Sequence, residues 1–143
     1  MMTDIEIAKA RLNGHSICLC KDGECLTDDS KGIAPMMRLI AEGRDLSGYS
    51  VADVIVGKAA AMLFVKAGIR AVYGEVMSQA GYAYLKARHI PCAYGTLTDK
   101  IINRKGDGLC PMEQAVAETD DPEEGYIALK ERLAQLQKGA AHV

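Results

Sequence analysis

The stretch IRAVYGEVMSQAGYAYLKARHIPCAYGTL, residues 69–97, decides the fold. Its first nine residues are rich in β-branched and aromatic side chains, and IPCAYGTL (90–97) has the same character, so both segments are predicted to be strands. The run between them, which begins at Ser78, has the composition of a helix with a serine N-cap. Two strands joined by a crossover of about a dozen residues run parallel. The stretch therefore predicts a right-handed βαβ unit.

The rest of the chain predicts a hairpin and several helices around this unit. HSICLCKDGECLTDD (15–29) carries the pair Asp22-Gly23 between two apolar runs, the strongest short-range signal of a hairpin. Helices are expected to begin after Thr3 and at Pro35, Val54, Pro111 and Pro122. The helix from Val54 is an alanine-rich run that ends at Gly68, with Asp53 available as its cap. We expect an α/β fold: a three-layer α-β-α sandwich with a mixed sheet of about four strands.

Length and charge fit one globular domain, which is expected to span residues 1–143. The net charge is −2 and acids alternate with bases along the chain, so DNA is not an expected partner. The N-terminus has no apolar core of a signal peptide. The longest apolar run is far shorter than the roughly 20 residues that a membrane span needs. The composition therefore predicts a cytoplasmic protein without a membrane partner.

Two predicted helix starts could hold a ligand: Gly57-Lys58 and Ser78. In open α/β sheets ligands bind beyond the carboxyl ends of the strands. The free N–H groups of a helix start suit an anion, and Lys58 would add a full positive charge. A small anionic or nucleotide-like molecule is therefore one expected partner. The alternative is structural: Gly57 would permit close packing, and Lys58 would extend into solvent.

The loop NRKGDGLC (103–110) could cover such a ligand. Asn103 and Arg104 are candidate ligand-binding residues, because a guanidinium can clamp a carboxylate or a phosphate. The glycine-lysine ending of a P-loop is missing. On spacing alone, the simpler alternative is a solvated turn.

Cys110 stands directly before Pro111, which places it at the N-cap of a predicted helix with Glu113 in the position of a capping box. A helix start and neighbouring basic residues lower the pKa of a thiol, whereas the Glu113 carboxylate opposes this. If the protein is an enzyme, Cys110 is the candidate nucleophile or redox thiol, and Asp107 or Glu75 is the candidate acid or base. The alternative is a half-buried cysteine without chemistry.

Cys18, Cys20 and Cys25 form a second group. Across a two-residue turn Cys20 lies opposite Cys25, and the period of a strand puts Cys18 on the same face. Reduced thiols are expected in the predicted compartment. The CxxC spacing of structural zinc sites is absent, so core packing is favoured over metal binding. No metal and no cofactor are predicted, with the three thiols as ligands left as the alternative.

The runs SVADVIVGKAAAMLFVKAGIRAVYGEVMSQAGYAYL (50–85) and IINRKGDGLCPMEQAV (101–116) resemble a small bacterial family without an assigned reaction. The resemblance extends from about Ile17 to Val116. It implies a cytidine-deaminase-like fold, and such folds often form homo-oligomers. The zinc motifs of true deaminases are missing, because neither GKAAA nor SQAG supplies a ligand and Cys92 has no second cysteine two residues later. We therefore expect a zinc-independent enzyme or a small-molecule-binding protein. A regulatory or oligomer-forming module without catalysis is the alternative.

Overall fold

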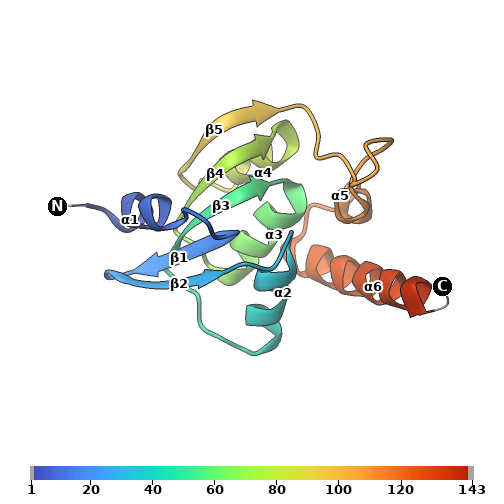
Figure 1. Ribbon diagram of the computed structural model, residues 1–143, viewed down its shortest axis with the longest axis horizontal. Helices are drawn as coiled ribbons and strands as arrows, with labels where there is room; N and C mark the ends of the chain where they lie inside the picture. Colours follow the sequence, from blue (N-terminus) through green and yellow to red (C-terminus); the bar gives the residue numbers. More distant parts are fainter. Residues whose placement is uncertain (1, 142–143) are drawn as a thin grey trace.

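The structure, a computed structural model, describes residues 2–141 and is built around a five-stranded mixed sheet (Figure 1). The expected domain of residues 1–143 thus includes three residues, 1, 142 and 143, that lie outside this range. The strands, in the spatial order β2-β1-β3-β4-β5, are β1 Ile17–Lys21, β2 Glu24–Asp28, β3 Ser50–Val56, β4 Ala71–Ser78 and β5 Cys92–Thr98. The helices are α1 Asp4–Arg11, α2 Ala34–Ala41, α3 Lys58–Ala67, α4 Gln79–Ala87, α5 Pro111–Val116 and α6 Pro122–Ala141.

The parallel unit predicted from residues 69–97 is confirmed. Strands β4 and β5 pair in parallel and are joined by α4, whose N-cap is Ser78. Pro91 immediately precedes β5, where a missing N–H disturbs no ladder bond, and its carbonyl accepts from the N–H of Val72. The carboxyl ends of β4 and β5 therefore reach the same edge of the sheet.

The prediction of a helix over residues 54–68 is wrong at its start. Residues Ser50–Val56 form β3, which pairs in parallel with β4, and the helix begins only at Lys58. The run SVADVIV is apolar and β-branched, which is typical of a strand buried on both faces. Asp53 consequently lies inside the strand and does not cap a helix. The parallel part of the sheet has three strands, and the whole sheet has five where about four were expected.

The predicted hairpin is confirmed, with Cys20 opposite Cys25 in the register of β1 and β2. Its turn needs positive φ at Asp22 (51°) and Gly23 (82°), which suits a short polar residue followed by glycine. Reduced thiols were expected, but Cys20 and Cys25 form a disulfide. The reason is the pairing itself, because directly opposed residues bring the two sulfur atoms within bonding reach, with the Cα atoms 4.2 Å apart.

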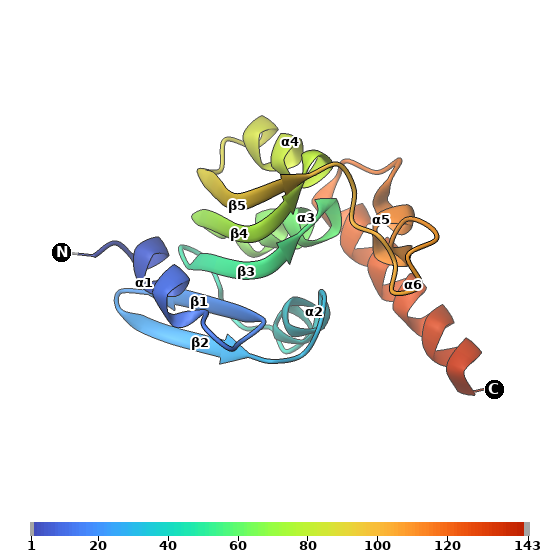
Figure 2. The same cartoon turned by 45° about the horizontal axis from the view of Figure 1, so that its top comes forward.

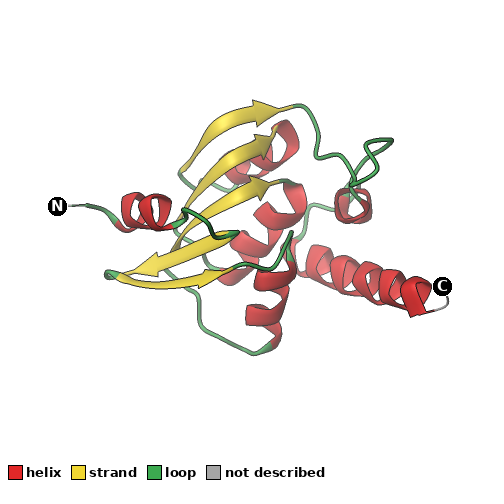
Figure 3. Cartoon of the chain, viewed as in Figure 1, coloured by secondary structure: helices red, strands yellow, loops and turns green. Residues whose placement is uncertain are grey.

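Helices cover both faces of the sheet (Figures 2 and 3). Among the described helices, only α1 lies against one face, over β1, β3 and β4; Ala8 of α1 and Leu12, which follows the helix, are buried there. The other face carries α3 and α4, with α2, α5 and α6 packed against α3. The larger core lies on this second side and is aliphatic, with Phe64 fully buried in α3. Within residues 2–141, no helix is both long enough and apolar enough to cross a membrane.

Candidate functional site

The starts of α3 and α4 lie side by side at the carboxyl edge of the parallel strands. Each helix follows its strand directly, α3 after β3 and α4 after β4. The contact is close enough to need glycine: a Cβ atom added at Gly81 would stand 2.9 Å from the carbonyl carbon of Gly57. Two sets of helix N–H groups therefore converge at one place, which is the geometry that favours an anion.

The start of α3 is already occupied by a carboxylate of the protein itself. Glu113, from α5, accepts the N–H of Lys58 with Oε1 and the N–H of Ala59 with Oε2, both at 2.8 Å. The Glu113 residue is only 8% exposed. A Cβ atom at Gly57 would lie 2.6 Å from this carboxyl group, so glycine is what allows the approach. Glu113 was expected to complete a capping box with Cys110; this expectation is wrong, because the side chain reaches a different helix.

Lys58 and Ser78 are both engaged near this carboxylate. The Lys58 ammonium group lies 3.2 Å from Oδ1 of Asp120 and donates to the carbonyl of Ala117 at 3.4 Å. Ser78 is buried, and its hydroxyl accepts the N–H of Gly81 at 3.0 Å. Lys58 thus binds the segment that follows α5, while Ser78 caps its own helix. Of the structural alternative, the close packing at Gly57 is present, but Lys58 does not extend into solvent, because its side chain is only 13% exposed.

The loop before α5 closes on itself. The Asn103 amide donates to Asp107 at 2.9 Å, and the Asp107 N–H donates back to the Asn103 side chain. Arg104 and Asp107 are exposed on this loop, and Asn103 is half-buried. This arrangement agrees with the solvated turn that spacing alone favoured. The side-chain contacts of Asn103 and Asp107 stay within the loop.

The candidate catalytic residues are not assembled in this structure. Cys110 is the half-buried N-cap of α5, as predicted, but its side chain makes no capping hydrogen bond. Glu75 is exposed on β4. Among the described residues, no hydrogen bond or ion pair joins any two of Cys110, Asp107 and Glu75. The geometry is therefore that of an occupied anion site, without a formed acid–base or nucleophile pair.

Residues 7–133 match the family described as a domain of unknown function, DUF1893. The chain belongs to this family. A solved structure, that of a DUF1893 family protein (TM1506) from Thermotoga maritima, is 25% identical, with a TM-score of 0.74 over 86% of this chain and 82% of that chain. No curated protein matches. The comparisons give this DUF1893 chain a family and an α/β fold without a reaction.

Sequence reasoning missed one buried polar group of this DUF1893 protein. Asp53 lies in the middle of β3 and is 7% exposed. Burial raises the pKa of its carboxyl group to about 7, and the negative charge of Glu75 adds to the rise. Hydrogen bonds from the backbone N–H groups of Ile55 and Val54 act in the opposite direction and lower this pKa. Asp53 is the only charged residue in the otherwise apolar run SVADVIV, and this pattern could have indicated a buried carboxyl group.

The surface is hollowed elsewhere. Two hollows have volumes of about 430 and 290 Å³. The first is lined by residues at the start of α1 and by Ser50 and Arg70, near the amino ends of β3 and β4. The second is lined by Lys86 of α4 and by His89, which follows that helix. Neither includes the starts of α3 and α4, in keeping with a site that Glu113 fills.

Proposed function

We propose that this DUF1893 protein binds a small anionic or nucleotide-like molecule at the starts of α3 and α4, on a cytidine-deaminase-like fold without zinc. The observation that carries the proposal is the Glu113 carboxylate on the N–H groups of Lys58 and Ala59. A site that binds one carboxylate with two amides and a nearby ammonium has the chemistry to bind a ligand carboxylate or phosphate. Glu113 then holds the place of the ligand's anionic group.

Ligand entry requires Glu113 to leave, and the placement of α5 suits such a displacement. Helix α5 has only six residues and lies between the loop of residues 99–110 and the connection to α6. It is held from outside by the Arg132 guanidinium, which donates to the carbonyl of Pro111 at 2.9 Å. Helix α5 packs mainly against α6 and α3, so it can shift without disturbing the strand pairing of the sheet.

Thiol chemistry at Cys110 is the finer part of the proposal. Cys110 lies three residues before Glu113, so a movement that frees the helix starts also moves the thiol. Asn103, Arg104 and Asp107 lie on the loop that precedes Cys110 and would reach a bound ligand only after this movement. Cys110→Ser should leave anion binding unchanged, because the proposed anion contacts are backbone N–H groups, and should remove any covalent reaction with an electrophilic ligand analogue.

The proposal is tested by titrating inorganic phosphate and a nucleoside monophosphate into wild type and Glu113→Ala, with the amide resonances of Lys58 and Ala59 as the readout. In Glu113→Ala the vacated amides should bind phosphate at least about 10-fold more tightly than in wild type, because no internal carboxylate competes. Glu118→Ala is the matched control, since it removes an exposed glutamate near α5. Unshifted amides in Glu113→Ala at saturating concentrations of both anions would refute the anion site.

A second candidate, an oligomer-forming module, is favoured by strand β5. Residues 93–97 are exposed although the strand is parallel, a class that is normally buried on both faces. The strand lies at the edge of the sheet, contains no charged residue or proline, and exposes Tyr94 and Leu97. Charged residues or proline on an edge strand usually prevent it from pairing with a strand of another molecule, and β5 has neither. Native mass spectrometry should show a homodimer in wild type and a monomer in Leu97→Lys; a monomer in both rules out this interface.

A further inference from the structure

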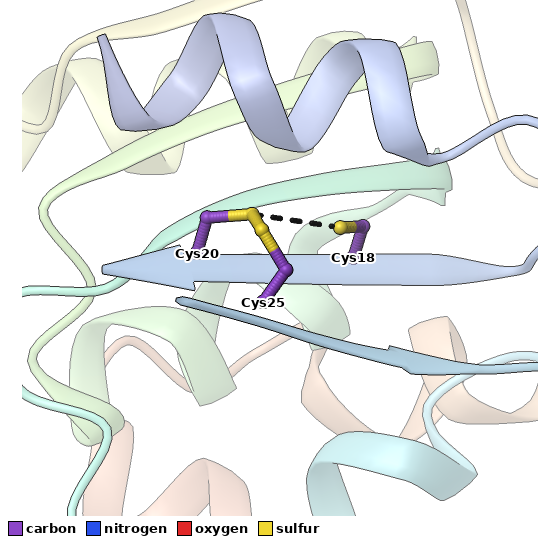
Figure 4. Close-up of side chains that lie close together, drawn as sticks. All are labelled: Cys18, Cys20 and Cys25. Atoms are coloured by element: carbon purple, nitrogen blue, oxygen red, sulfur yellow. Dashed lines mark hydrogen bonds between the residues drawn. A yellow bond between two sulfur atoms is a disulfide. The ribbon is translucent and has the colours of Figure 1, made fainter. Parts of the chain in front are cut away.

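We infer that Cys18, Cys20 and Cys25 form a binding site for one copper(I) ion when reduced, and that the Cys20–Cys25 disulfide closes this site. Figure 4 shows the three side chains on the face of the hairpin that α1 covers, with Cys18 and Cys20 on β1 and Cys25 on β2. The site is separate from the helix starts at Lys58 and Ser78, so it does not depend on the anion proposal.

The spacing of the sulfur atoms carries the inference. All three Sγ atoms lie within 4.8 Å of one another, and those of Cys18 and Cys20 are 3.7 Å apart. A thiolate–metal bond of about 2.3 Å places three sulfurs in a trigonal plane at about 4 Å from one another. Once the Cys20–Cys25 bond is reduced, small side-chain rotations bring the three sulfurs to this spacing without moving the backbone.

The donor set selects the metal. Three thiolates and no nitrogen or oxygen ligand form a soft site, which favours copper(I). Structural zinc is bound by four ligands, and the described residues place no histidine, carboxylate or further cysteine in this cluster. This leaves the expectation of a zinc-free protein in place. Copper(I) is stable with three sulfur ligands, so the site is complete for it.

The surroundings suit a protected metal that is loaded from one side. Cys18 and Cys20 are fully buried against Ala8, Leu12 and Ala52, whose small and apolar side chains exclude water. Cys25 is half-buried on β2, the edge strand of the sheet, and is the point of access from solvent. The positive charge of Arg11, the last residue of α1, acts on Cys18.

The chemistry balances with a dithiol as the reductant. The dithiol transfers two electrons and two protons to the Cys20–Cys25 bond, giving two thiols, and itself becomes a cyclic disulfide. Copper(I) then displaces the thiol protons into solvent without a change in its own oxidation state. A small-molecule disulfide then reverses the reaction by thiol–disulfide exchange: it takes the two electrons of the Cys20 and Cys25 thiolates, leaves as two thiols that take protons from solvent, and re-forms the Cys20–Cys25 bond. Two of the three ligands are lost in this step, and the ion is released.

The test is anaerobic titration of copper(I) into the dithiol-reduced full chain, freed of excess dithiol, in competition with a chromophoric copper(I) chelator. Wild type should bind one ion with a coordination sphere of three sulfurs by X-ray absorption. Cys18→Ala, Cys20→Ala and Cys25→Ala should each bind at least about 100-fold more weakly, since the loss of outer-sphere partners alone lowers metal affinity by 10–100-fold. Cys92→Ser and Cys110→Ser are the matched controls and should bind as wild type does.

Two further measurements keep the inference falsifiable if an alanine variant loses its fold, which circular dichroism reports. Arg11→Gln, a change on the surface of α1, should lower affinity about 10-fold. The oxidised chain, identified by a mass lower by two hydrogens, should bind no copper at this site. The assignment would be overturned if oxidised and reduced chains bound copper(I) equally, or if wild type and a folded Cys18→Ala variant did. It would also be overturned if the same cysteines bound zinc as tightly as copper(I).

Discussion

Replacing Glu113 by alanine is expected to lower the free energy of unfolding by about 3 kcal/mol. The carboxylate accepts two N–H groups at the start of α3, and Ala59 is almost fully buried. Hydrogen bonds to a charged group contribute about 1.5–3 kcal/mol, and the helix dipole adds to them. Urea unfolding at pH 7 measures the loss. Glu113→Gln keeps one acceptor oxygen without the charge and should lose roughly half as much.

A double-mutant cycle with Gly57→Ala separates this contact from general damage to α5. In wild type the new Cβ would stand 2.6 Å from the Glu113 carboxyl group and displace it, so Gly57→Ala should cost about 3 kcal/mol. In the Glu113→Ala background the same change should cost only about 1 kcal/mol, the difference between glycine and alanine as an N-cap. Additive losses would show that the carboxylate does not rest on Gly57.

The sequence was sufficient for those elements whose signals are local. The β4–α4–β5 unit followed from composition and a serine cap, and the hairpin followed from Asp22-Gly23. Strand β3 was missed because a buried parallel strand has no alternation, and its apolar run continues into the alanines of α3 with only Gly57 between them. The cytidine-deaminase-like type remains part of the proposal, because the family match carries no such description.

The position of the candidate site could be predicted from the sequence, but the group that binds the start of α3 could not. Helix starts that follow adjacent parallel strands must share one edge, so Gly57, Lys58 and Ser78 could be grouped from topology. The partner of α3 could not be found in this way, because Glu113 is 55 residues from Lys58 and its local pattern fits a capping box equally well. The disulfide was missed for another reason: the register put Cys20 opposite Cys25, but the expected compartment favoured reduced thiols.

The second large effect concerns Asp53, whose replacement by asparagine should stabilise the protein at pH 8. Burial raises the pKa of this carboxyl from 3.8 to about 7 in the folded state. Below pH 3.8 it is protonated in both states and costs nothing. Between 3.8 and about 7 only the unfolded state loses the proton, so stability falls as pH rises, and above 7 the loss is complete. At about 1.4 kcal/mol per pKa unit the full loss is on the order of 4 kcal/mol.

Asp53→Asn removes this dependence and retains an oxygen that can accept the N–H of Ile55, as Oδ1 of Asp53 does at 3.3 Å. Unfolding midpoints measured from pH 4 to pH 8 should converge for wild type and Asp53→Asn at the acid end and diverge towards pH 8. Glu75→Gln is the matched control: it removes the neighbouring negative charge that raises the pKa of Asp53, so it should shift the wild-type transition to slightly lower pH without abolishing it. Parallel curves for wild type and Asp53→Asn would mean that Asp53 is hydrated and ionised in the folded protein. Asp53 lies in β3, four residues before Gly57, which is the N-cap of α3. Because its carboxyl has a pKa of about 7, the stability of the strand that leads into the proposed anion site should depend on pH near neutrality.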